Sequence, residues 1–483
     1  MSYLWEYPTN WIPTQPLEKM EQVHYDVLIV GSGAGGGAAL YRLCEQWKKR
    51  GAKKIGILEK GNKLFHSHAL NIPTMNNDRM WGQLLPDNST PVGKRLPQFP
   101  GALLVFALGG RSLFWNAVSP RPPLFEWKKW PISQQELDGY YRLAEKIMNV
   151  TTLFTKDSTM QEILWRRLIS NGIPEATDAP LAIDLMRSQM GKTYSNAWFS
   201  SINFLAYALN NRHYDLAINA YTTHVYVEKG KVLGVNVISP EKKHYTIRAK
   251  HVIVSASTLE TPRLLLNSSI KGHAIGRYLT SHSFFRAFGK IYKSMFPENV
   301  GNLAVLKQET TYAPYQIQIL GPDQYFAYQQ FEETNLPELL GVTYAAFGRV
   351  ESRPENRVFV DPTIKDEYGV PLNQVNFSYS KQDYDVINQT RHGIYQSAHA
   401  MGVTLNAEPE LVLPGGDYHE SCSCRMGIDP DTSATNRFGQ IHGVEGLFVA
   451  DNSVLPSLAA ANPTLSTVAL ALRTADYIVM RSG

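Results

Sequence analysis

The chain has only three cysteines in 483 residues, and their positions do not suggest a disulfide or a metal site. Cys422 and Cys424 are separated by one residue, a spacing that suits neither a structural disulfide nor a zinc site. Cys44 falls in a stretch with helical composition, where we expect a buried thiol. This use of cysteine is typical of a reducing compartment, and we expect no metal centre.

The chain also has little net charge and no long apolar run. A formal charge of +4 gives no reason to expect a nucleic acid or an anionic membrane surface as a partner. No apolar run approaches the length of a membrane span, and residues 1–11 lack the basic and apolar regions of a signal peptide. We therefore expect a cytoplasmic protein without a membrane span, although export with a partner that carries the signal stays open.

What the sequence does contain is a glycine-rich pattern near its N-terminus. Residues 25–30 form a short apolar run typical of a buried parallel strand, and Gly31, Gly33 and Gly36 follow at G-x-G-x-x-G spacing. In this pattern the first glycine permits a tight turn, the second lets the backbone approach a pyrophosphate, and the third lets helix and strand pack closely. The N-terminus of the next helix then faces the phosphate charge.

A helix and a second strand complete a βαβ unit. Residues 38–51 have helical composition and end on a basic run and a glycine, and residues 55–58 form a second strand closed by Glu59. The distance along the chain from Gly36 to Glu59 suits an acidic residue that binds a ribose hydroxyl. The glycines alone would fit an ordinary turn, but the whole order of elements predicts a dinucleotide site.

Two further regions differ in pattern. Residues 213–254 show period-2 strands with a hairpin turn at 228–231. Residues 283–410 mix apolar and aromatic strands with Pro- and Gly-containing turns, which predicts an antiparallel sheet inserted between parts of the first domain. The other expected elements are a helix from residue 132 with Ser133 as N-cap, a helix at 383–401, a strand at 446–451 and a helix at 463–480.

Four blocks together resemble the glucose–methanol–choline (GMC) flavoprotein oxidoreductases. The first is GSGAGGG with Glu59, and the second is GGRSLFWNAVSPRP at 109–122. The third is SASTLETPRLLLNSS at 255–269, and the fourth runs from HESCSCRMG at 419–427 to Asn462 and Pro463. Trp115 after GGRSLF is most similar to the short, pyranose-oxidase-like and gluconate-dehydrogenase-like branch.

The resemblance implies an α/β fold in two domains. A Rossmann-like FAD-binding domain, of the GMC and p-hydroxybenzoate-hydroxylase-like type, would carry an inserted α+β substrate domain built on an antiparallel sheet. We expect the FAD-binding domain to comprise residues 1–150, 196–282 and 415–483, with the catalytic His and Asn in the last part. The substrate domain would take helices from 151–195 and its sheet from 283–414.

The resemblance also implies FAD as the cofactor. Some members of this branch attach flavin covalently through a His, but the matching position here is Phe114, so we expect non-covalent FAD. Ser257 and Cys422 stand where the family usually or often has Gly, which puts a local turn and one active-site wall in question. The implied FAD-binding residues are Gly31, Gly33, Ala34, Gly36, Glu59, Lys60, Gly109, Gly110, Ser112, Trp115, Asn116, Ala117, Val225, Ser257, Asp451, Asn462, Pro463 and Thr464.

The same resemblance assigns the catalytic residues. Oxidation of a hydroxyl needs a base for the O–H proton and a second group that fixes the alcohol oxygen. His419 matches the family's base and Asn462 matches its partner. An Asn before Pro463 is also an ideal N-cap for the last helix, and the two roles are compatible. Among the other histidines, His282 is expected to be structural, and His442 is the next candidate base.

The implied enzyme is an FAD-dependent GMC alcohol oxidoreductase. It would oxidise a hydroxyl of a sugar, glycoside or polyol to a carbonyl, with proton abstraction by His419 and hydride transfer to flavin N5. Its partners would be a small alcohol or sugar and an electron acceptor, and oxidase and dehydrogenase both stay open. The alternatives are a sterol or aliphatic alcohol as substrate, or a noncatalytic flavin-bound subunit. An NAD-dependent dehydrogenase is opposed by the second to fourth blocks.

Overall fold

The structure is a computed structural model that describes residues 11–49, 51–72, 74–92, 99–185, 198–297, 300–323 and 336–482. The first ten residues, which belong to the stretch judged to lack a signal peptide, fall outside these ranges, as does Arg50 of the predicted basic helix end. Within these ranges no helix is both long and apolar enough to cross a membrane.

The first sheet is built around the strand that precedes the glycine loop. Its order is β8-β2-β1-β11-β10-β9, and β20 pairs with β11. The strands β8, β2, β1, β11 and β20 are parallel, and β11, β10 and β9 are antiparallel, with the predicted hairpin between β9 and β10. Their bounds are β1 His24–Val30, β2 Ile55–Leu58, β8 Asp215–Ala217, β9 Tyr221–Glu228, β10 Lys231–Ile238, β11 His244–Val254 and β20 Leu447–Val449.

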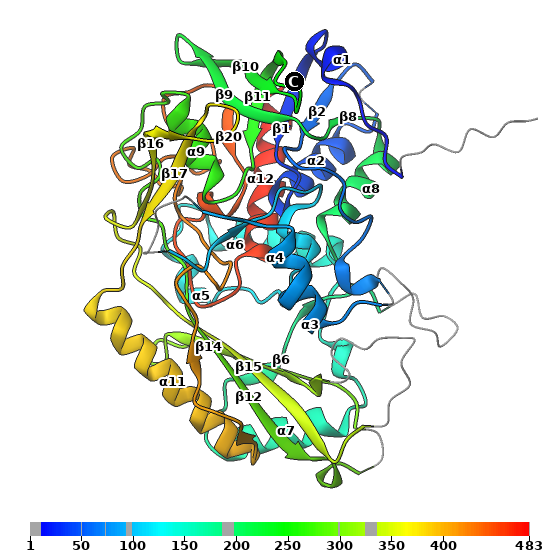
Figure 1. Cartoon of the computed structure of the whole chain (residues 1–483), viewed down its shortest axis with the longest axis vertical. Coiled ribbons are helices and arrows are strands. Elements are labelled where there is room, and N and C mark those ends of the chain that lie inside the picture. The colour runs from blue at the N-terminus through cyan, green and yellow to red at the C-terminus, as the bar shows by residue number, and fades with distance from the viewer. Residues whose placement is uncertain are drawn as a thin grey trace, which may run out of the picture.

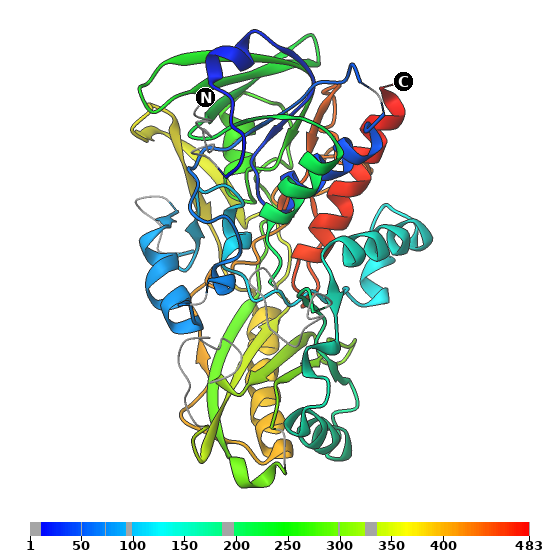
Figure 2. The ribbon, with the colours of Figure 1, turned by 90° about the vertical axis from the view of Figure 1, so that its right-hand side faces the viewer.

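Three helices pack side by side next to this sheet. Helix α2 (Ala34–Gln46) contacts both α12 (Thr464–Arg481) and α8 (Ser201–Asn211), as Figure 2 shows. Arg42 on α2 ties it to α12 through Asp476, with Nε 2.7 Å from Oδ1. The sequence predicts that α2 extends to the basic run at 48–51, but it ends at Gln46 because the chain turns at Trp47, whose side chain is fully buried.

The second sheet lies below the first in Figure 1 and is antiparallel, as predicted. Its order is β18-β12-β15-β14-β13-β6, and β19 pairs with β12. Helices α7 (Thr159–Ser170) and α11 (Lys381–Met401) pack against it and share its apolar core. The strands are β6 Ala176–Asp178, β12 Ser283–Tyr292, β13 Leu303–Lys307, β14 Tyr315–Gly321, β15 Leu339–Gly348, β18 Thr404–Leu405 and β19 Glu410–Leu411.

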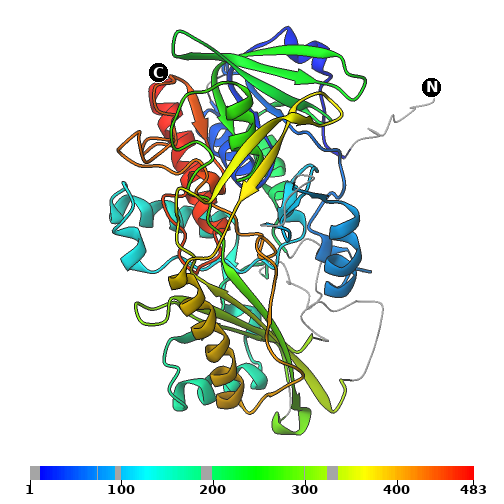
Figure 3. The ribbon, with the colours of Figure 1, turned by 60° about the vertical axis from the view of Figure 1, so that its left-hand side comes forward.

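One hairpin from the interval 283–414 belongs to neither large sheet. Strands β16 (Arg357–Lys365) and β17 (Pro371–Asn376) pair with each other and pack against α9 (Glu260–Asn267) beside the first sheet, as Figure 3 shows. Arg263 on α9 binds Asp366 in the hairpin turn at 2.7 Å. The interval predicted as one substrate sheet therefore contributes to two regions of the molecule.

Shorter elements join these layers. Helix α6 (Gln134–Ile147) begins at the predicted cap, because Ser133 Oγ accepts the Glu136 N–H at 3.3 Å. The remaining elements are α1 Leu17–Glu21, η1 Ala69–Asn71, α3 Asn77–Arg79, η2 Met80–Leu84, α4 Leu85–Asp87, β3 Thr90–Pro91, β4 Leu103–Leu104, η3 Gly110–Leu113, α5 Leu124–Trp127, β5 Val150–Thr151, η4 Leu153–Thr155, β7 Leu181–Ala182, η5 Lys293–Met295 and η6 Asn452–Val454.

Candidate active site

A cavity of about 1380 Å³ is lined by residues from both large sheets. The carboxyl ends of β1 and β2 reach it at Val30 and Leu58. The second sheet lines it with alternate residues of β12, namely Phe284, Arg286 and Phe288, because successive side chains of a strand point to opposite faces. The opposite face of that sheet is buried against α7 and α11.

The glycine loop has the geometry that a dinucleotide phosphate requires. Gly31 has φ of +98°, and a Cβ there would lie 2.2 Å from the Ser255 carbonyl oxygen. A Cβ at Gly36 would lie 2.0 Å from the Gly31 carbonyl oxygen, so helix and strand are in close contact. A Cβ at Gly33, by contrast, would meet nothing within 4 Å and would fill part of the cavity. This open cradle fits a pyrophosphate.

Glu59 and Lys60 line the cavity at the end of β2. Glu59 Oε2 accepts hydrogen bonds from Ser32 N at 3.1 Å and Ser32 Oγ at 2.6 Å, while burial raises the pKa of this carboxyl. Lys60 Nζ lies over two aromatic rings, at 3.8 and 4.0 Å from their centroids, and burial lowers its pKa. Glu59, the residue predicted to bind a ribose hydroxyl, is thus held in place by Ser32 of the glycine loop.

The second sequence block forms another wall of the cavity. Gly110 begins η3 with φ of +56°, and Ser112 Oγ accepts the Ser201 N–H at 2.8 Å and donates to the Gly109 carbonyl at 2.6 Å. Asn116 lines the cavity, and its buried Oδ1 has no hydrogen-bond partner among the described residues. An unpaired buried acceptor is costly, so this atom fits a ligand that donates a hydrogen bond.

Asp451 closes β20 in the same way that Glu59 closes β2. Its Oδ2 accepts the Ser257 N–H at 3.0 Å and the Thr261 hydroxyl at 2.5 Å, and burial raises its pKa. Ser257 has φ of +91° and Cys422 has φ of +73°. These two departures from the family's Gly therefore keep a backbone conformation that favours glycine, at a cost of roughly 1–2 kcal/mol each.

Most of the predicted cofactor residues line this one cavity, and four do not. Gly36, Gly109, Val225 and Pro463 are absent from its wall, and Val225 lies in β9 with its N–H bonded to Ser268 Oγ at 2.8 Å. The residues that line it are Gly31, Gly33, Ala34, Glu59, Lys60, Gly110, Ser112, Trp115, Asn116, Ala117, Ser257, Asp451, Asn462 and Thr464. The roles of all of these in binding stay predictions.

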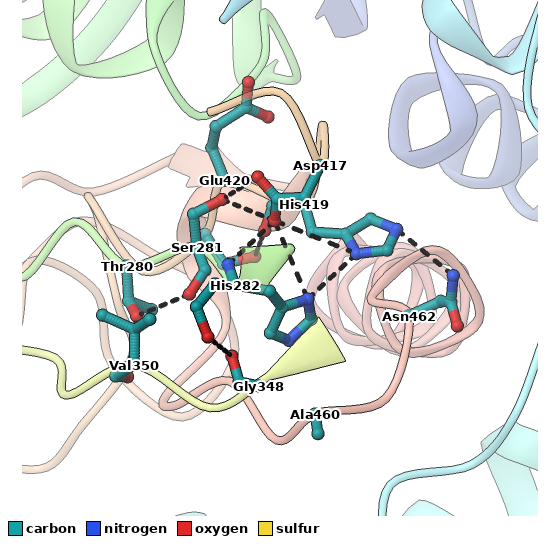
Figure 4. Close-up of polar contacts among 12 residues, drawn as sticks. Thr280, Ser281, His282, Gly348, Val350, Asp417, His419, Glu420, Ala460 and Asn462 are labelled. Atoms are coloured by element: carbon teal, nitrogen blue, oxygen red, sulfur yellow. Dashed lines mark hydrogen bonds and ion pairs between the residues drawn. The ribbon is translucent and has the colours of Figure 1, made fainter. Parts of the chain in front are cut away.

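The two predicted catalytic residues face each other at the cavity wall. His419 Nε2 lies 3.2 Å from Asn462 Nδ2, although the residues are 43 positions apart in the chain (Figure 4). The His419 side chain is 13% exposed and lines the cavity. The other candidate base, His442, bonds Ser433 Oγ at 3.0 Å and does not line the cavity.

The expected helix cap at Asn462 is wrong. Helix α12 starts at Thr464 with Pro463 as its N-cap residue, and no side chain caps it. Asn462 Oδ1 instead accepts hydrogen bonds from Gln316 Nε2 at 2.8 Å and Gln318 Nε2 at 2.6 Å. Both glutamines come from β14, so the second sheet fixes the orientation of this amide.

Burial sets the charges around His419. It lowers the pKa of His419 well below its usual value, and the nearby His282 and Arg111 lower it further. Burial also lowers the pKa of His282 to about 4. For Asp417 burial and then the charge of Glu420 raise the pKa to about 7. Both imidazoles are therefore neutral at neutral pH.

Two residues that the sequence did not assign to the site contact His419. His282 Nδ1 lies 3.0 Å from His419 Nδ1, and Asp417 Oδ2 lies 4.0 Å from the same atom. Asp417 in turn accepts the His282 N–H at 2.8 Å and the Ser281 hydroxyl at 2.6 Å. His282 and His419 are 137 positions apart, so no local pattern could reveal their contact. The one signal in the sequence was the spacing of Asp417 and His419, which are two residues apart and could therefore lie close together.

Comparison with known proteins identifies the family. One GMC oxidoreductase family model matches residues 27–284, and a second, for the C-terminal part, matches residues 352–471. The chain belongs to the GMC oxidoreductase family. The predicted family membership is confirmed, and this GMC oxidoreductase is an FAD-dependent alcohol oxidoreductase. The glycine cradle and the unpaired Asn116 acceptor fit that cofactor.

Relatives of this GMC oxidoreductase act on different alcohols. It is 28% identical to a C-glycoside 3-oxidase of Arthrobacter globiformis over 399 residues, covering 78% of this chain and 75% of the relative. It is 24% identical to a 2-methyl-1,2-propanediol dehydrogenase of Mycolicibacterium austroafricanum over 544 residues, covering 94% and 95%. An Aspergillus oryzae formate oxidase structure covers 95% of this chain and 98% of its own, with a TM-score of 0.70 at 15% identity. The last likeness confirms the predicted fold.

Proposed function

We propose that this enzyme oxidises a hydroxyl of a sugar, glycoside or polyol to a carbonyl, with His419 as the base. The observation that carries the proposal is the facing pair of His419 Nε2 and Asn462 Nδ2, 3.2 Å apart at the wall of the cavity. An alcohol oxygen that lies beside the pair, within hydrogen-bond distance of both nitrogens, would donate its proton to His419 and accept a hydrogen bond from Asn462. Bound FAD supplies the hydride acceptor, at flavin N5.

The surroundings of His419 support its role as a base. A lowered pKa keeps the imidazole neutral near neutral pH, so that a ring nitrogen has a lone pair to accept a proton in the transition state. Asp417 lies behind the ring, with Oδ2 4.0 Å from Nδ1, where its charge would stabilise the imidazolium that forms. Arg111 is paired with Glu420 at 2.6 Å, which limits the positive field at the base.

The lining of the cavity supports a sugar or polyol over a sterol. Trp81 and Tyr418 line it and stack on each other with centroids 5.9 Å apart, and Trp115 lines another part. Amphipathic rings of this kind suit a sugar face. Arg286, Gln318 and other polar groups stand among the apolar ones on the second sheet. The C-glycoside 3-oxidase activity of one relative favours the same class.

We also propose the division into an FAD-binding part and a substrate part at the boundaries given above, except that the β16–β17 hairpin goes with the FAD-binding part, because it packs on α9. Its support is the second antiparallel sheet, which has its own core with α7 and α11 and lines the cavity with one face. The FAD would be held without a covalent bond, because Phe114 occupies the position of the attachment His and lines the cavity.

The test is anaerobic bleaching of the flavin across a panel of sugars, glycosides, polyols, aliphatic alcohols and sterols. We expect at least one sugar, glycoside or polyol to bleach the flavin faster than any simple alcohol. Admission of oxygen then separates an oxidase, which recolours rapidly, from a dehydrogenase. Bleaching by aliphatic alcohols or sterols alone would contradict the substrate class, and no bleaching by any hydroxyl compound would leave a noncatalytic flavin-bound subunit.

A further inference from the structure

His282 lies directly behind the proposed base. Figure 4 shows its ring next to His419, on the side opposite to Asn462. It is 1% exposed and stands one residue before β12, at the join between the first part of the chain and the second sheet. Its Nδ1 is 3.0 Å from His419 Nδ1, and its Nε2 is 2.7 Å from the carbonyl oxygen of Ala459.

A row of hydrogen bonds runs from the Ala459 carbonyl through His282 and His419 to Asn462. The Ala459 carbonyl sets the direction of each of them. A carbonyl oxygen only accepts, so His282 Nε2 must carry the hydrogen. In a neutral imidazole the other nitrogen then holds a lone pair, so His282 Nδ1 accepts and His419 Nδ1 donates. With its hydrogen on Nδ1, neutral His419 has its lone pair on Nε2.

The opposite end of the row requires the same arrangement. Gln316 and Gln318 both donate to Asn462 Oδ1, so the Nδ2 group of that amide is the one that faces His419. An amide NH₂ only donates, which requires a lone pair on His419 Nε2. Two anchors in different parts of the chain therefore agree, one on the loop before α12 and one on β14.

We propose that His282 is a positioning residue that holds His419 in the tautomer with the hydrogen on Nδ1. That tautomer leaves Nε2 free to accept the substrate proton, whereas the other would present an N–H to the alcohol and to Asn462. The inference rests on the proposed role of His419 as the base. Asp417 supports this positioning role, because its Oδ2 accepts the His282 backbone N–H at 2.8 Å and so fixes the position of His282.

A purely structural role for His282 is the rival, because its ring also packs edge-on against Phe347 with centroids 5.6 Å apart. His251 provides a matched control. Its ring nitrogen lies 3.1 Å from the Asp26 carbonyl oxygen and its ring packs on Phe448, but it has no contact with His419 and does not line the cavity. Replacing either ring by Phe removes the same kind of backbone hydrogen bond.

The direct test is the tautomer of His419 in the FAD-loaded enzyme labelled with ¹⁵N-histidine. Two-bond ¹H–¹⁵N spectra distinguish the two neutral tautomers, and His419→Gln identifies the signals. We expect the Nδ1–H form in the wild type and in His251→Phe, and a mixed or Nε2–H form in His282→Phe. An Nε2–H form in the wild type would overturn the proposal, and this outcome needs no variant at His282 to fold.

Flavin reduction gives a second readout. His282→Phe should slow it by about 10- to 100-fold, whereas His251→Phe should not change it. His282→Asn keeps an amide oxygen near the position of Nδ1 and should recover part of the rate. A wild-type rate and tautomer in His282→Phe would contradict the positioning role. The tautomer is read in the resting enzyme, so it stands or falls independently of whether His419→Ala loses activity.

Discussion

At the scale of single residues, Asn462 holds three partners at once. Its Nδ2 faces His419, and its Oδ1 accepts from Gln316 and Gln318. We predict that Asn462→Ala slows flavin reduction on the order of 10²-fold, because the reacting oxygen loses a fixed donor. The change should also lower the free energy of unfolding by about 1–3 kcal/mol, because two buried glutamine amides lose their acceptor.

Stopped-flow reduction and denaturant unfolding measure the two effects separately. Gln316→Met is the control, because it removes one of the two donors without touching the cavity wall. An Asn462→Ala variant with wild-type stability would contradict the account of its side-chain contacts. A wild-type reduction rate would contradict its contact with the substrate oxygen.

The raised pKa of Asp417 leads us to predict how the rate of flavin reduction depends on pH. Burial and then Glu420, itself paired with Arg111, raise its pKa to about 7, while burial keeps the pKa of His419 well below its usual value. As pH rises through about 7, Asp417 loses its proton and gains a charge 4.0 Å from His419 Nδ1. That charge stabilises the imidazolium, so flavin reduction should accelerate over this interval.

The matched variant is Asp417→Asn, which keeps the size of the side chain and stays neutral. We expect its reduction rate to remain at the level that the wild type shows at low pH. Anaerobic stopped-flow across neutral pH measures both profiles. A step near pH 7 that persists in Asp417→Asn would assign the titration to another group.

The sequence could predict the pair His419 and Asn462 because each stands in a family block. It could not predict His282 or Asp417 as neighbours of the base. His282 ends one predicted domain part and Asp417 lies near the start of another, so their contact depends on the fold. In sequence, a buried His that packs against a helix cannot be told from one that contacts a catalytic side chain. The error at Asn462 had a related cause, since an Asn-Pro pair predicts a cap and the competing partners lie on a distant strand.

At the scale of elements, the glycine loop makes a sharp prediction. Gly33 has φ of −64° and open space beside it, so Gly33→Val should fold but should place its side chain where the phosphate would lie. We expect a folded protein without FAD. In Gly36→Val the new side chain would meet the Gly31 carbonyl at 2.0 Å, so folding itself should fail.

Circular dichroism and flavin content together measure these two outcomes. Normal FAD content in Gly33→Val would mean that the phosphate lies elsewhere. A stable, flavin-loaded Gly36→Val would contradict the close packing of α2 on the first sheet. Because strand, turn and helix are contiguous, this unit was predictable from the residues alone, apart from the end of α2.

At the scale of the whole molecule, two sheets, the second with an apolar core of its own, line one cavity. The antiparallel pattern predicted the second sheet, but two of its relations were not visible in sequence. β6 joins its edge from Ala176–Asp178, and three residues carry no periodicity. The sequence pattern of the β16–β17 hairpin predicts a part of the second sheet, but the hairpin packs on α9, where Arg263 forms an ion pair with Asp366.

The residue at position 114 predicts whether the flavin leaves the protein on denaturation. Phe114 offers no nucleophile for a covalent link, so denaturation should release all of the FAD into solution. Acid precipitation followed by the absorbance of the supernatant measures this. Flavin that remains with the pellet would contradict non-covalent binding and would require an attachment residue elsewhere in the chain.

The central claim is that His419 takes the proton from the substrate hydroxyl, and anaerobic stopped-flow on His419→Ala tests it most directly. The variant should fold and keep FAD, because the ring contacts that the described residues show, with His282, Asn462 and Phe347, lie at the cavity wall. The account predicts flavin reduction on the order of a thousandfold slower than in the wild type, within the range of about 10²–10⁴ typical for loss of a positioned base. An unchanged rate of flavin reduction would contradict it.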